Sequence, residues 1–400
     1  MQLFELKRRS KSYSNLPIIN KKAKSSPVTP LAMDFFRKNT FNFNIESEKP
    51  INFPELGSSK ASSYKSSNSM RTFNFTERPI PKLLPSTVST GSFGEVRGYA
   101  ANTHQGLVRT YNEDKALIIL RIQHKDINEK YQHWPDCSFF GLYDGHGGHL
   151  CSNFLKENLH HFILDNHHFP LSPKKAIIHG FEKAEAKFTE LAKLKGDNSG
   201  SCPLVVLIVG KKCYIANVGD SRAILSTQKG NETYNLSRDH RPADEAEHNR
   251  IRAAGGQVYI SSKLNVKDHK AYRIFPGGLN VSRTIGDLNA KIEEHGGIPN
   301  VISSQPEIRT LKIKNDHDFI MMGCDGIFDV LSTKEVIETI WKSSVEEENM
   351  VSNACRKGVE AVISESMRKR SSDNLTAIII ALGGFEVFCR NLFTSRVLQE

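Results

Sequence analysis

The sequence predicts an α+β protein in which antiparallel β-sheets are covered by helices. Apolar runs rich in β-branched and aromatic residues, each ended by Gly or Asp, lie close together in pairs. Between them lie segments whose apolar residues recur every three or four positions. Strands bunched in this way favour antiparallel pairing over the regular strand–helix alternation of a parallel sheet. The 400 residues are enough to bury a large core.

The expected elements follow from these runs. Strands are expected at 115–123, 137–144, 203–210, 213–220, 222–226, 318–325 and 374–382. Two of them meet at Lys211 and Lys212, a spacing that suits a tight hairpin. Helices are expected at 150–163 and 176–194, and two more after Pro242 and Ser332.

The chain divides by composition. Residues 1–97 are rich in Ser, Asn, Lys and Pro, so they bury too little apolar surface to offset the entropy of folding. We expect a largely disordered basic tail there, with basic clusters at 7–11 and 21–24. Residues 98–385 are expected to form the folded domain, and residues 386–400 a short C-terminal tail.

The positive charge lies mainly in that tail. Residues 1–98 hold 16 Lys and Arg against 7 Asp and Glu, whereas the rest of the chain holds 38 against 37. A folded domain so close to neutral does not favour nucleic acid as a partner.

The cysteines and the apolar runs indicate the compartment. The seven cysteines are scattered without a CxxC pair, which favours a reducing environment and argues against disulfides and structural zinc. None has Arg six positions later, so the signature of the thiolate phosphatases is absent. No apolar run approaches the roughly 18 residues of a membrane span, and the N-terminus resembles neither a signal peptide nor a myristoylation site. We therefore expect a soluble monomer in the cytoplasm, the nucleus or both, with no membrane partner.

The stretch STGSFGEV (89–96) partly matches the phosphate-covering loop of protein kinases, GxGxxGxV. Ser89 replaces the first glycine of that pattern. The later kinase motifs fail as well, because SRDH at 237–240 has no following Asn at the required spacing and the nearest approach to DFG is Asp325-Gly326-Ile327. These failures argue against the kinase interpretation.

Acidic residues stand at the ends of several expected strands. They are Glu113, Asp114, Asp144, Asp220, Asp325 and Asp373. If these strand ends meet at one edge, the carboxylates repel one another, and a divalent cation removes that cost. Ligands that are all oxygen favour the hard cations Mg²⁺ and Mn²⁺. Each aspartate alone also fits a turn or cap residue, but the set together favours a metal centre.

The stretch DGHGG (144–148) and a nearby arginine add further candidates. Gly145 allows its carbonyl to approach a metal closely. His146 is a natural proton donor, although a turn histidine bonded to the backbone is the alternative. Arg109, four residues before Glu113, can bind phosphate through two N–H groups, and its alternative is a surface ion pair.

Seven motifs occur in a recognisable order. They are GLVRTYNED (106–114), LYDGHGG (142–148), GDSRA (219–223), LSRDHRP (236–242), LNVSRTIGD (279–287), MGCDGIFDVLS (322–332) and SSDNLTAI (371–378). Together they resemble the metal-dependent protein Ser/Thr phosphatases of type 2C, over about residues 98–385. The resemblance implies a β-sandwich flanked by helices, in α/β/β/α layers, with a two-metal centre at one edge of the sandwich.

The resemblance also implies roles for the acidic residues. Asp144 would bridge both metals, and Gly145 would contribute its carbonyl. Asp325 and Asp373 would bind one of the metals. Glu113 and Asp114 would hold waters of the centre, while Asp220 and Asp329 match the positions of a weaker third cation.

Other residues receive roles in the same way. Arg109 would bind phosphate and His146 would be the general acid, whereas Arg283 and Asp287 are expected to brace the sheet edge. Two departures from the family pattern should affect packing beneath the site rather than its chemistry. GSCP (200–203) stands where GSTA is more common, and Phe328 replaces the usual Trp.

The expected function is hydrolysis of phosphoserine and phosphothreonine in phosphorylated protein substrates. Two Mg²⁺ or Mn²⁺ ions would activate a water for in-line attack on phosphorus, with no covalent intermediate. The alternative is a catalytically inactive phosphatase-like module that binds and regulates a partner. Such modules typically lose a metal carboxylate, and here every one is present. Residues 227–275 are expected to carry a flap near the site.

Overall fold

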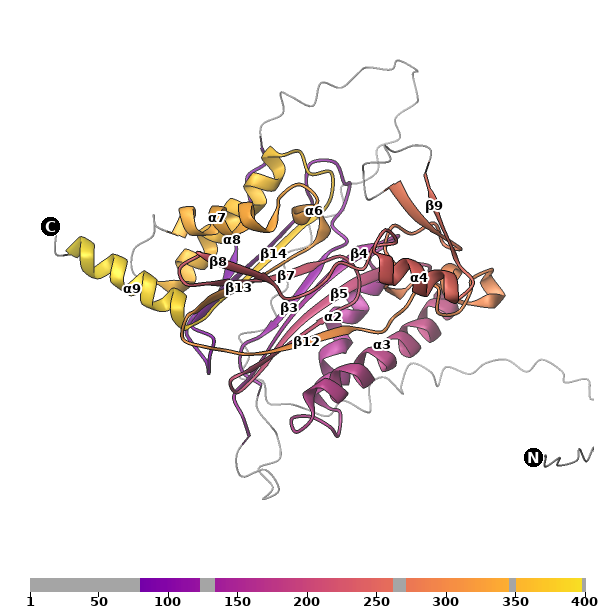
Figure 1. Cartoon of the computed structure of the whole chain (residues 1–400), viewed down its shortest axis with the longest axis horizontal. Helices are drawn as coiled ribbons and strands as arrows, with labels where there is room; N and C mark the ends of the chain where they lie inside the picture. Colours follow the sequence, from indigo (N-terminus) through magenta and orange to yellow (C-terminus); the bar gives the residue numbers. More distant parts are fainter. Residues whose placement is uncertain (1–79, 123–133, 262–270, 345–349, 398–400) are drawn as a thin grey trace, which may run out of the picture. The chain divides into compact units, whose positions relative to one another are not determined.

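A computed structural model of the chain describes residues 80–122, 134–261, 271–344 and 350–397, with 392–397 described through their backbone alone. The basic clusters expected at 7–11 and 21–24, and most of the expected tail, lie outside the described residues. Two six-stranded antiparallel sheets and the helices around them make up the described part (Figure 1).

The first sheet has the strand order β1-β2-β14-β13-β7-β8. Its strands are β1 Thr87–Val88, β2 Gly98–His104, β14 Leu375–Ala381, β13 His317–Gly323, β7 Arg222–Thr227 and β8 Glu232–Asn235. The second has the order β12-β6-β5-β4-β3, and β11 pairs with β5. Its strands are β12 Glu307–Lys312, β6 Lys212–Asn217, β5 Gly200–Val209, β4 Cys137–His146, β3 Lys115–Ile119 and β11 Ile285–Gly286. A separate hairpin joins β9 Gln257–Ile260 and β10 Tyr272–Phe275.

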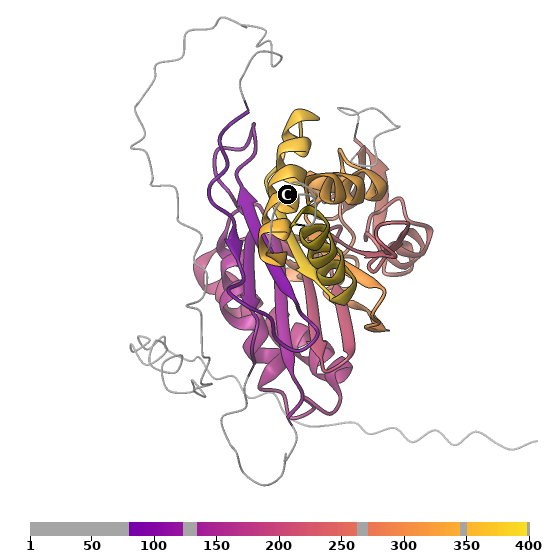
Figure 2. The ribbon, with the colours of Figure 1, turned by 90° about the vertical axis from the view of Figure 1, so that its left-hand side faces the viewer.

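Helices cover the outer face of each sheet (Figures 1 and 2). The second sheet is covered by α2 Leu150–Leu164 and α3 Pro173–Lys195, and the first by α7 Thr333–Ser344, α8 Val351–Arg368 and α9 Gly383–Val397. Helix α3 begins with Pro in its first turn and ends at Gly196 in the left-handed conformation, the common start and stop signals of a helix. Short elements lie between the strands: α4 Glu245–Ala253, α5 Leu288–Lys291, η4 Glu293–His295 and α6 Asp325–Phe328.

The apolar residues of the central strands alternate between two cores. In β4, Phe139 packs against α2 and α3, whereas Phe140 points into the space between the sheets. In β5, Val205 and Leu204 divide in the same way. Successive side chains of a strand point to opposite faces, so a run that is apolar throughout is buried on both. This confirms the expected α/β/β/α layers and explains the continuous apolar sequence PLVVLIV.

The ordered chain extends past both expected boundaries of the folded domain. Strand β1 pairs with β2 and Val96 is fully buried, although these residues precede position 98. Residues 383–397 form α9, although we expected a tail from residue 386. In both places a few apolar residues dock on the sheet or its helices, and average composition does not reveal such local docking.

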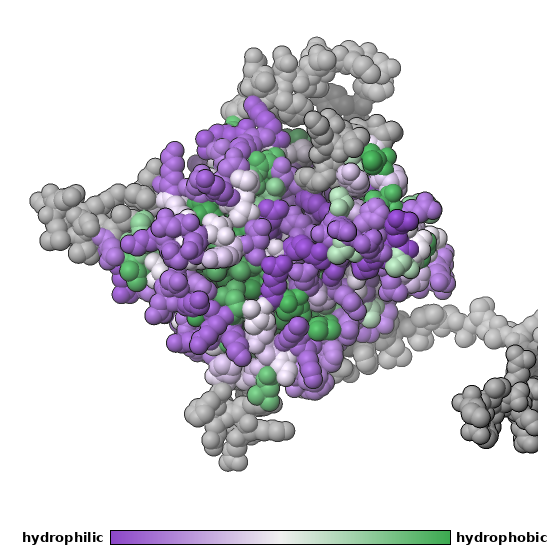
Figure 3. Space-filling view, in the orientation of Figure 1, coloured by the Kyte–Doolittle hydropathy of each residue, from purple (hydrophilic) through white to green (hydrophobic). Residues whose placement is uncertain are grey.

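The surface and the helices agree with a folded domain whose apolar residues are inside. The face seen in Figure 3 is mostly hydrophilic, with small hydrophobic groups between. None of the helices within the described residues has the length and apolar composition that crossing a bilayer requires. The seven cysteines are free thiols.

Glu247, in the first turn of α4, is a buried anion that ties its helix to the segment of Ser282 and Arg283. Its carboxylate accepts hydrogen bonds from Arg283, from Arg250 at 2.8 Å and from the Ser282 hydroxyl at 2.7 Å. The expectation that Arg283 is a structural partner agrees with this contact. Burial by itself raises the pKa of Glu247, but these donors outweigh it and lower the pKa to about 2.

We expect Glu247→Gln to lower the free energy of unfolding at pH 7 by about 3 kcal/mol, because two arginines lose a shared buried anion. The folded pKa of about 2 lies below the ordinary value of 4.5, so this stability is present above pH 4.5 and is lost as the pH falls toward 2. Urea unfolding at pH 7 and pH 4 measures the difference, which should be smaller at pH 4. The exposed neighbour Glu245 is the control, since Glu245→Gln should change stability by less than about 0.5 kcal/mol. Equal losses in the two variants would contradict this role.

Candidate metal centre

Antiparallel pairing brings several strand ends to one edge of the sandwich. Asp144 lies near the end of β4, and the register that pairs Tyr143 with Lys115 places Asp114 at the start of the neighbouring strand. Asp220 follows β6, and Asp325 follows β13 as the first residue of α6. The carboxylates that are far apart in the sequence therefore come from strand ends of both sheets, at β3, β4 and β6 in one and at β13 in the other.

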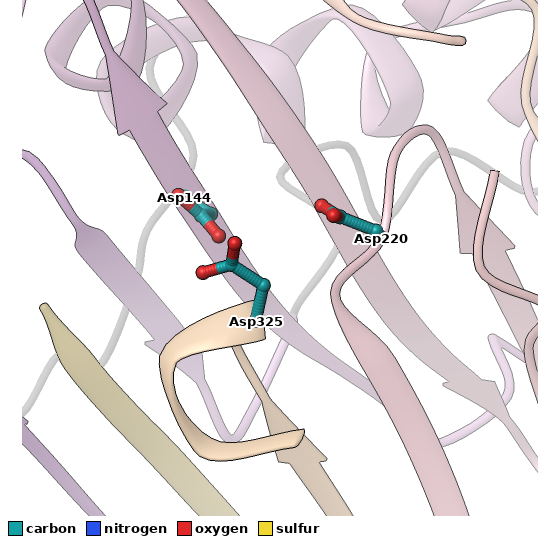
Figure 4. A group of neighbouring side chains, drawn as sticks. All are labelled: Asp144, Asp220 and Asp325. Carbon is teal, nitrogen blue, oxygen red and sulfur yellow. The ribbon is translucent and has the colours of Figure 1, made fainter. Parts of the chain in front are cut away.

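Three aspartates meet at this edge. One carboxylate oxygen from each of Asp144, Asp220 and Asp325 lies within 4.8 Å of the other two. Figure 4 shows Asp325 on α6 facing Asp144 on its strand, with Asp220 reaching toward both from a loop. Three of the six carboxylates expected to converge thus share one cluster.

The cluster is electrostatically costly without a cation. Burial, followed by repulsion from Asp114, Asp325 and Asp220, raises the pKa of Asp144 well above its ordinary value. Burial likewise raises the pKa of Asp114 to about 6, although a hydrogen bond from Thr376 opposes the rise. Three partly to fully buried carboxylates whose oxygens lie this close together could hold a divalent cation.

Hydrogen bonds hold Glu113 and Asp114 at the rim of the cluster. The backbone N–H of Gly148 donates to Glu113 Oε1 at 2.6 Å, and the Thr376 hydroxyl donates to Asp114 Oδ2 at 2.7 Å. Both side chains are buried. Their orientations are therefore set by the neighbouring strands and by the turn before α2.

Asn374 is a site residue that sequence reasoning missed. It is buried, it accepts from the Glu113 backbone N–H at 2.9 Å, and its amide donates to the carbonyls of Gln105 at 2.9 Å and Tyr111 at 3.1 Å. One side chain thus ties the start of β14 to the loop that carries Arg109. The motif SSDNLTAI indicated Asp373 as a ligand, but it gave no indication of a role for Asn374.

Asp373 and Arg109 form an ion pair beside the cluster. The guanidinium donates to Asp373 Oδ2 at 2.6 Å and lies 3.7 Å from Glu113 Oε2. The Arg109 side chain is 44% exposed, so it faces both the carboxylates and the solvent. Asp373 is not one of the three aspartates whose oxygens lie within 4.8 Å of one another. Its negative charge nevertheless contributes to raising the pKa values of Asp114 and Asp144.

Gly145 lies where no side chain fits. A Cβ atom there would come within 2.5 Å of the Glu113 carbonyl oxygen and 2.9 Å of Ser152 Oγ. The adjacent Asp144 carbonyl accepts from the Ser201 hydroxyl at 2.8 Å. The backbone after Asp144 is therefore tightly packed at the point where the resemblance places a ligand carbonyl.

His146 is paired with Asp287, a more specific contact than the expected brace. Its Nε2 lies 2.9 and 3.0 Å from the two Asp287 carboxylate oxygens. Burial lowers the pKa of His146, but the charge and hydrogen bond of Asp287 outweigh burial and raise it above 6.5. A Cβ at position 200 would lie 2.1 Å from Asp287 Oδ2 and 2.5 Å from His146 Nε2, so Gly200 provides the space for this pair.

Asp329 lies apart from the three converging aspartates. Its Oδ1 accepts from Arg241 Nη2 at 2.7 Å, and the same nitrogen lies 3.3 Å from Asp220 Oδ2. The two candidate ligands of a third cation therefore share a buried arginine, which sequence reasoning did not single out.

The two residues that depart from the family pattern both make packing contacts. The guanidinium of Arg222 lies over the Phe328 ring, 4.6 Å from its centroid. The buried Cys202 sulfur packs against Gly219, where an added Cβ would come within 2.4 Å of it.

Comparison with known proteins gives a consistent picture. A family model described as "Protein phosphatase 2C" matches residues 107–375. "Probable protein phosphatase 2C 27" of Arabidopsis thaliana is 34% identical over 61% of this chain and 58% of its own length. "Probable protein phosphatase 2C 57" of Oryza sativa subsp. japonica is 30% identical over 63% of this chain and 64% of its own length. The chain thus spans less than two thirds of either relative.

Among solved structures, the crystal structure of serine-threonine phosphatase 2C from Toxoplasma gondii has a TM-score of 0.61. It shares 21% identity and covers 76% of this chain and 98% of its own. At that identity the likeness shows the fold. The family match, which covers more than half of the chain and includes the residues of the acidic edge, shows that this chain belongs to the protein phosphatase 2C family.

Proposed function

We propose that the chain is a metal-dependent protein phosphatase that hydrolyses phosphoserine and phosphothreonine in protein substrates. The observation that carries this proposal is the convergence of Asp144, Asp220 and Asp325 within 4.8 Å at the sandwich edge. The names of the relatives agree with the activity, and they describe phosphatases of this family.

The acidic edge would hold two Mg²⁺ or Mn²⁺ ions through Asp144, the Gly145 carbonyl, Asp325 and Asp373. Glu113 and Asp114 are placed at its rim, where they can order water around the ions. When bound, ions of this kind lower the pKa of water and hold it for attack on phosphorus. The protein then needs no nucleophile of its own, which agrees with the missing CxxxxxR signature.

Arg109 is suited to bind the phosphoryl group. It is held at the cluster by Asp373 but is 44% exposed, so its remaining N–H groups can reach a phosphate that arrives from solvent. A guanidinium matches phosphate oxygens in a bidentate geometry. It would also neutralise the charge that spreads over those oxygens in the transition state.

His146 is suited to protonate the departing seryl or threonyl oxygen. Asp287 engages Nε2 at 2.9 Å, which fixes the ring and favours its protonated form. The ring is partly exposed beside the carboxylate cluster, so Nδ1 is the nitrogen that can deliver a proton. Asp287 acts through the histidine and is a positioning residue.

We expect Asp325→Asn to lower hydrolysis of p-nitrophenyl phosphate by about 100-fold or more, because the cluster loses a charged oxygen ligand. Activity of the parent chain should require added Mn²⁺ or Mg²⁺ and should disappear in EDTA. Initial rates across a metal titration measure both effects.

The matched control is Asp316→Asn, at the opposite end of β13, where the side chain is exposed. It should leave the rate and the metal requirement unchanged. Hydrolysis that persists in EDTA would contradict the metal dependence, whereas a parent chain inactive with every metal tried would favour the inactive binding module.

We expect His146→Ala to slow a phosphothreonine peptide by about 100-fold and p-nitrophenyl phosphate far less, because nitrophenolate leaves without a proton. Asp287→Asn should show the same substrate dependence with a loss of about tenfold, since the amide keeps the hydrogen bond but not the charge. The ratio of kcat values on the two substrates measures this, and each variant serves as its own control. Equal losses on both substrates would show that His146 is not the proton donor.

A further inference from the structure

Arg241, in the motif LSRDHRP, is a buried cation with no role in the proposed reaction. It lies between β8 and α4 and is 9% exposed. Arginine stays charged at any pH a folded protein tolerates. A permanent positive charge is tolerated in the protein interior where anionic partners compensate it. The partners of Arg241 therefore indicate its role.

Three carboxylates surround Arg241. Its Nη2 lies 2.7 Å from Asp329 Oδ1 and 3.3 Å from Asp220 Oδ2, and its Nε lies 3.7 Å from Asp239 Oδ2. Asp239 already accepts two hydrogen bonds from Arg222, at 3.0 and 2.7 Å. The charge of Arg241 therefore serves mainly Asp220 and Asp329.

Asp220 lies both in the acidic cluster and beside Arg241. Its carboxylate contributes an oxygen to the cluster with Asp144 and Asp325, seen in Figure 4, and its Oδ2 lies 3.3 Å from Arg241 Nη2. Asp329 is hydrogen-bonded to Arg241 and does not belong to that cluster. One guanidinium thus occupies the space between two carboxylates that could otherwise share a cation.

Arg241 makes fewer side-chain hydrogen bonds than Arg222 does. Arg222 uses Nε, Nη1 and Nη2 in hydrogen bonds to Asp239 and Thr333. Arg241 donates a hydrogen bond through Nη2, but its buried Nε and Nη1 have no hydrogen-bond partner among the described residues. A side chain held largely by charge is the one that a second cation can displace.

We propose that Arg241 is a built-in cation that competes with a third metal ion for Asp220 and Asp329. The third ion binds these carboxylates by displacing the guanidinium, and the residue at position 241 sets how weakly it binds. This inference rests on the proposed function, because it takes the two-ion centre at Asp144 and Asp325 as given. It concerns the number and affinity of the bound ions rather than the reaction.

The test measures Mn²⁺ binding to the metal-free full chain by calorimetry and by the EPR signal of free Mn²⁺. We expect Arg241→Gln to tighten the weakest site about tenfold or more, because the competing charge is gone, and to leave the tighter sites within about threefold. Arg241→Lys keeps the charge and should stay near the parent. Arg222→Gln, which removes a cation bonded to Asp239 and Thr333 rather than to Asp220 or Asp329, should not tighten the weakest site.

A second measurement covers the case in which Arg241→Gln does not fold. In the parent chain, the ¹⁵Nε NMR signal of Arg241, assigned with Arg241→Lys, should shift as Mg²⁺ fills the weakest site and not before. An unchanged weakest affinity in Arg241→Gln, or an arginine signal that stays fixed throughout the Mg²⁺ titration, would overturn the inference. If Mn²⁺ fills the tighter sites but Arg241→Gln does not tighten the weakest one, this inference alone is refuted. A parent chain that binds no Mn²⁺ refutes the proposed function as well.

Discussion

Repulsion between buried carboxylates at one sandwich edge is the constraint around which the described structure is arranged. Asp114 and Asp144 both have raised pKa values because burial and neighbouring charges disfavour ionisation. Such a group persists when the rest of the fold overcomes its cost. The cores between and outside the two sheets provide that stability through the apolar alternation of β4 and β5. Burial of these apolar residues therefore offsets part of the cost of keeping the charges together.

The scaffold holds these charges through hydrogen bonds from strand residues and from Asn374, which directly precedes β14. Thr376 on β14 donates to Asp114, Ser201 on β5 donates to the Asp144 carbonyl, and Asn374 fixes the backbone of Glu113. Side chains held by regular elements keep a site's geometry more accurately than side chains on free loops. A site built this way is ready for cations before they arrive, which lowers the entropy cost of binding them.

The local sequence pattern predicted the sheets, the hairpin at Lys211 and the acidic strand ends, because the spacing of apolar residues and the identity of turn residues depend only on neighbouring positions. It did not predict the contacts that orient the site. His146 meets Asp287 across 141 residues of sequence, and no local feature of either residue indicates the other. The clearest hint was Gly200, whose lack of a side chain makes sense once the strand register places it beside that pair. Family resemblance supplied roles for the carboxylates, but it was silent on the partners that hold them, since those depend on three-dimensional packing.

Two arginines pair with carboxylates at or near the acidic cluster, and they differ in how far their side chains are exposed to solvent. Arg109 holds Asp373 and is 44% exposed, whereas Arg241 holds Asp329 and its side chain is 11% exposed. Because charge in contact with solvent is screened and charge in the interior is not, the same guanidinium group acts differently at the two places. In our proposal, the exposed arginine exchanges its carboxylate partner for an incoming phosphate. The buried one has little contact with solvent, so its charge acts on the carboxylates themselves, and in our proposal it competes with further positive charge there.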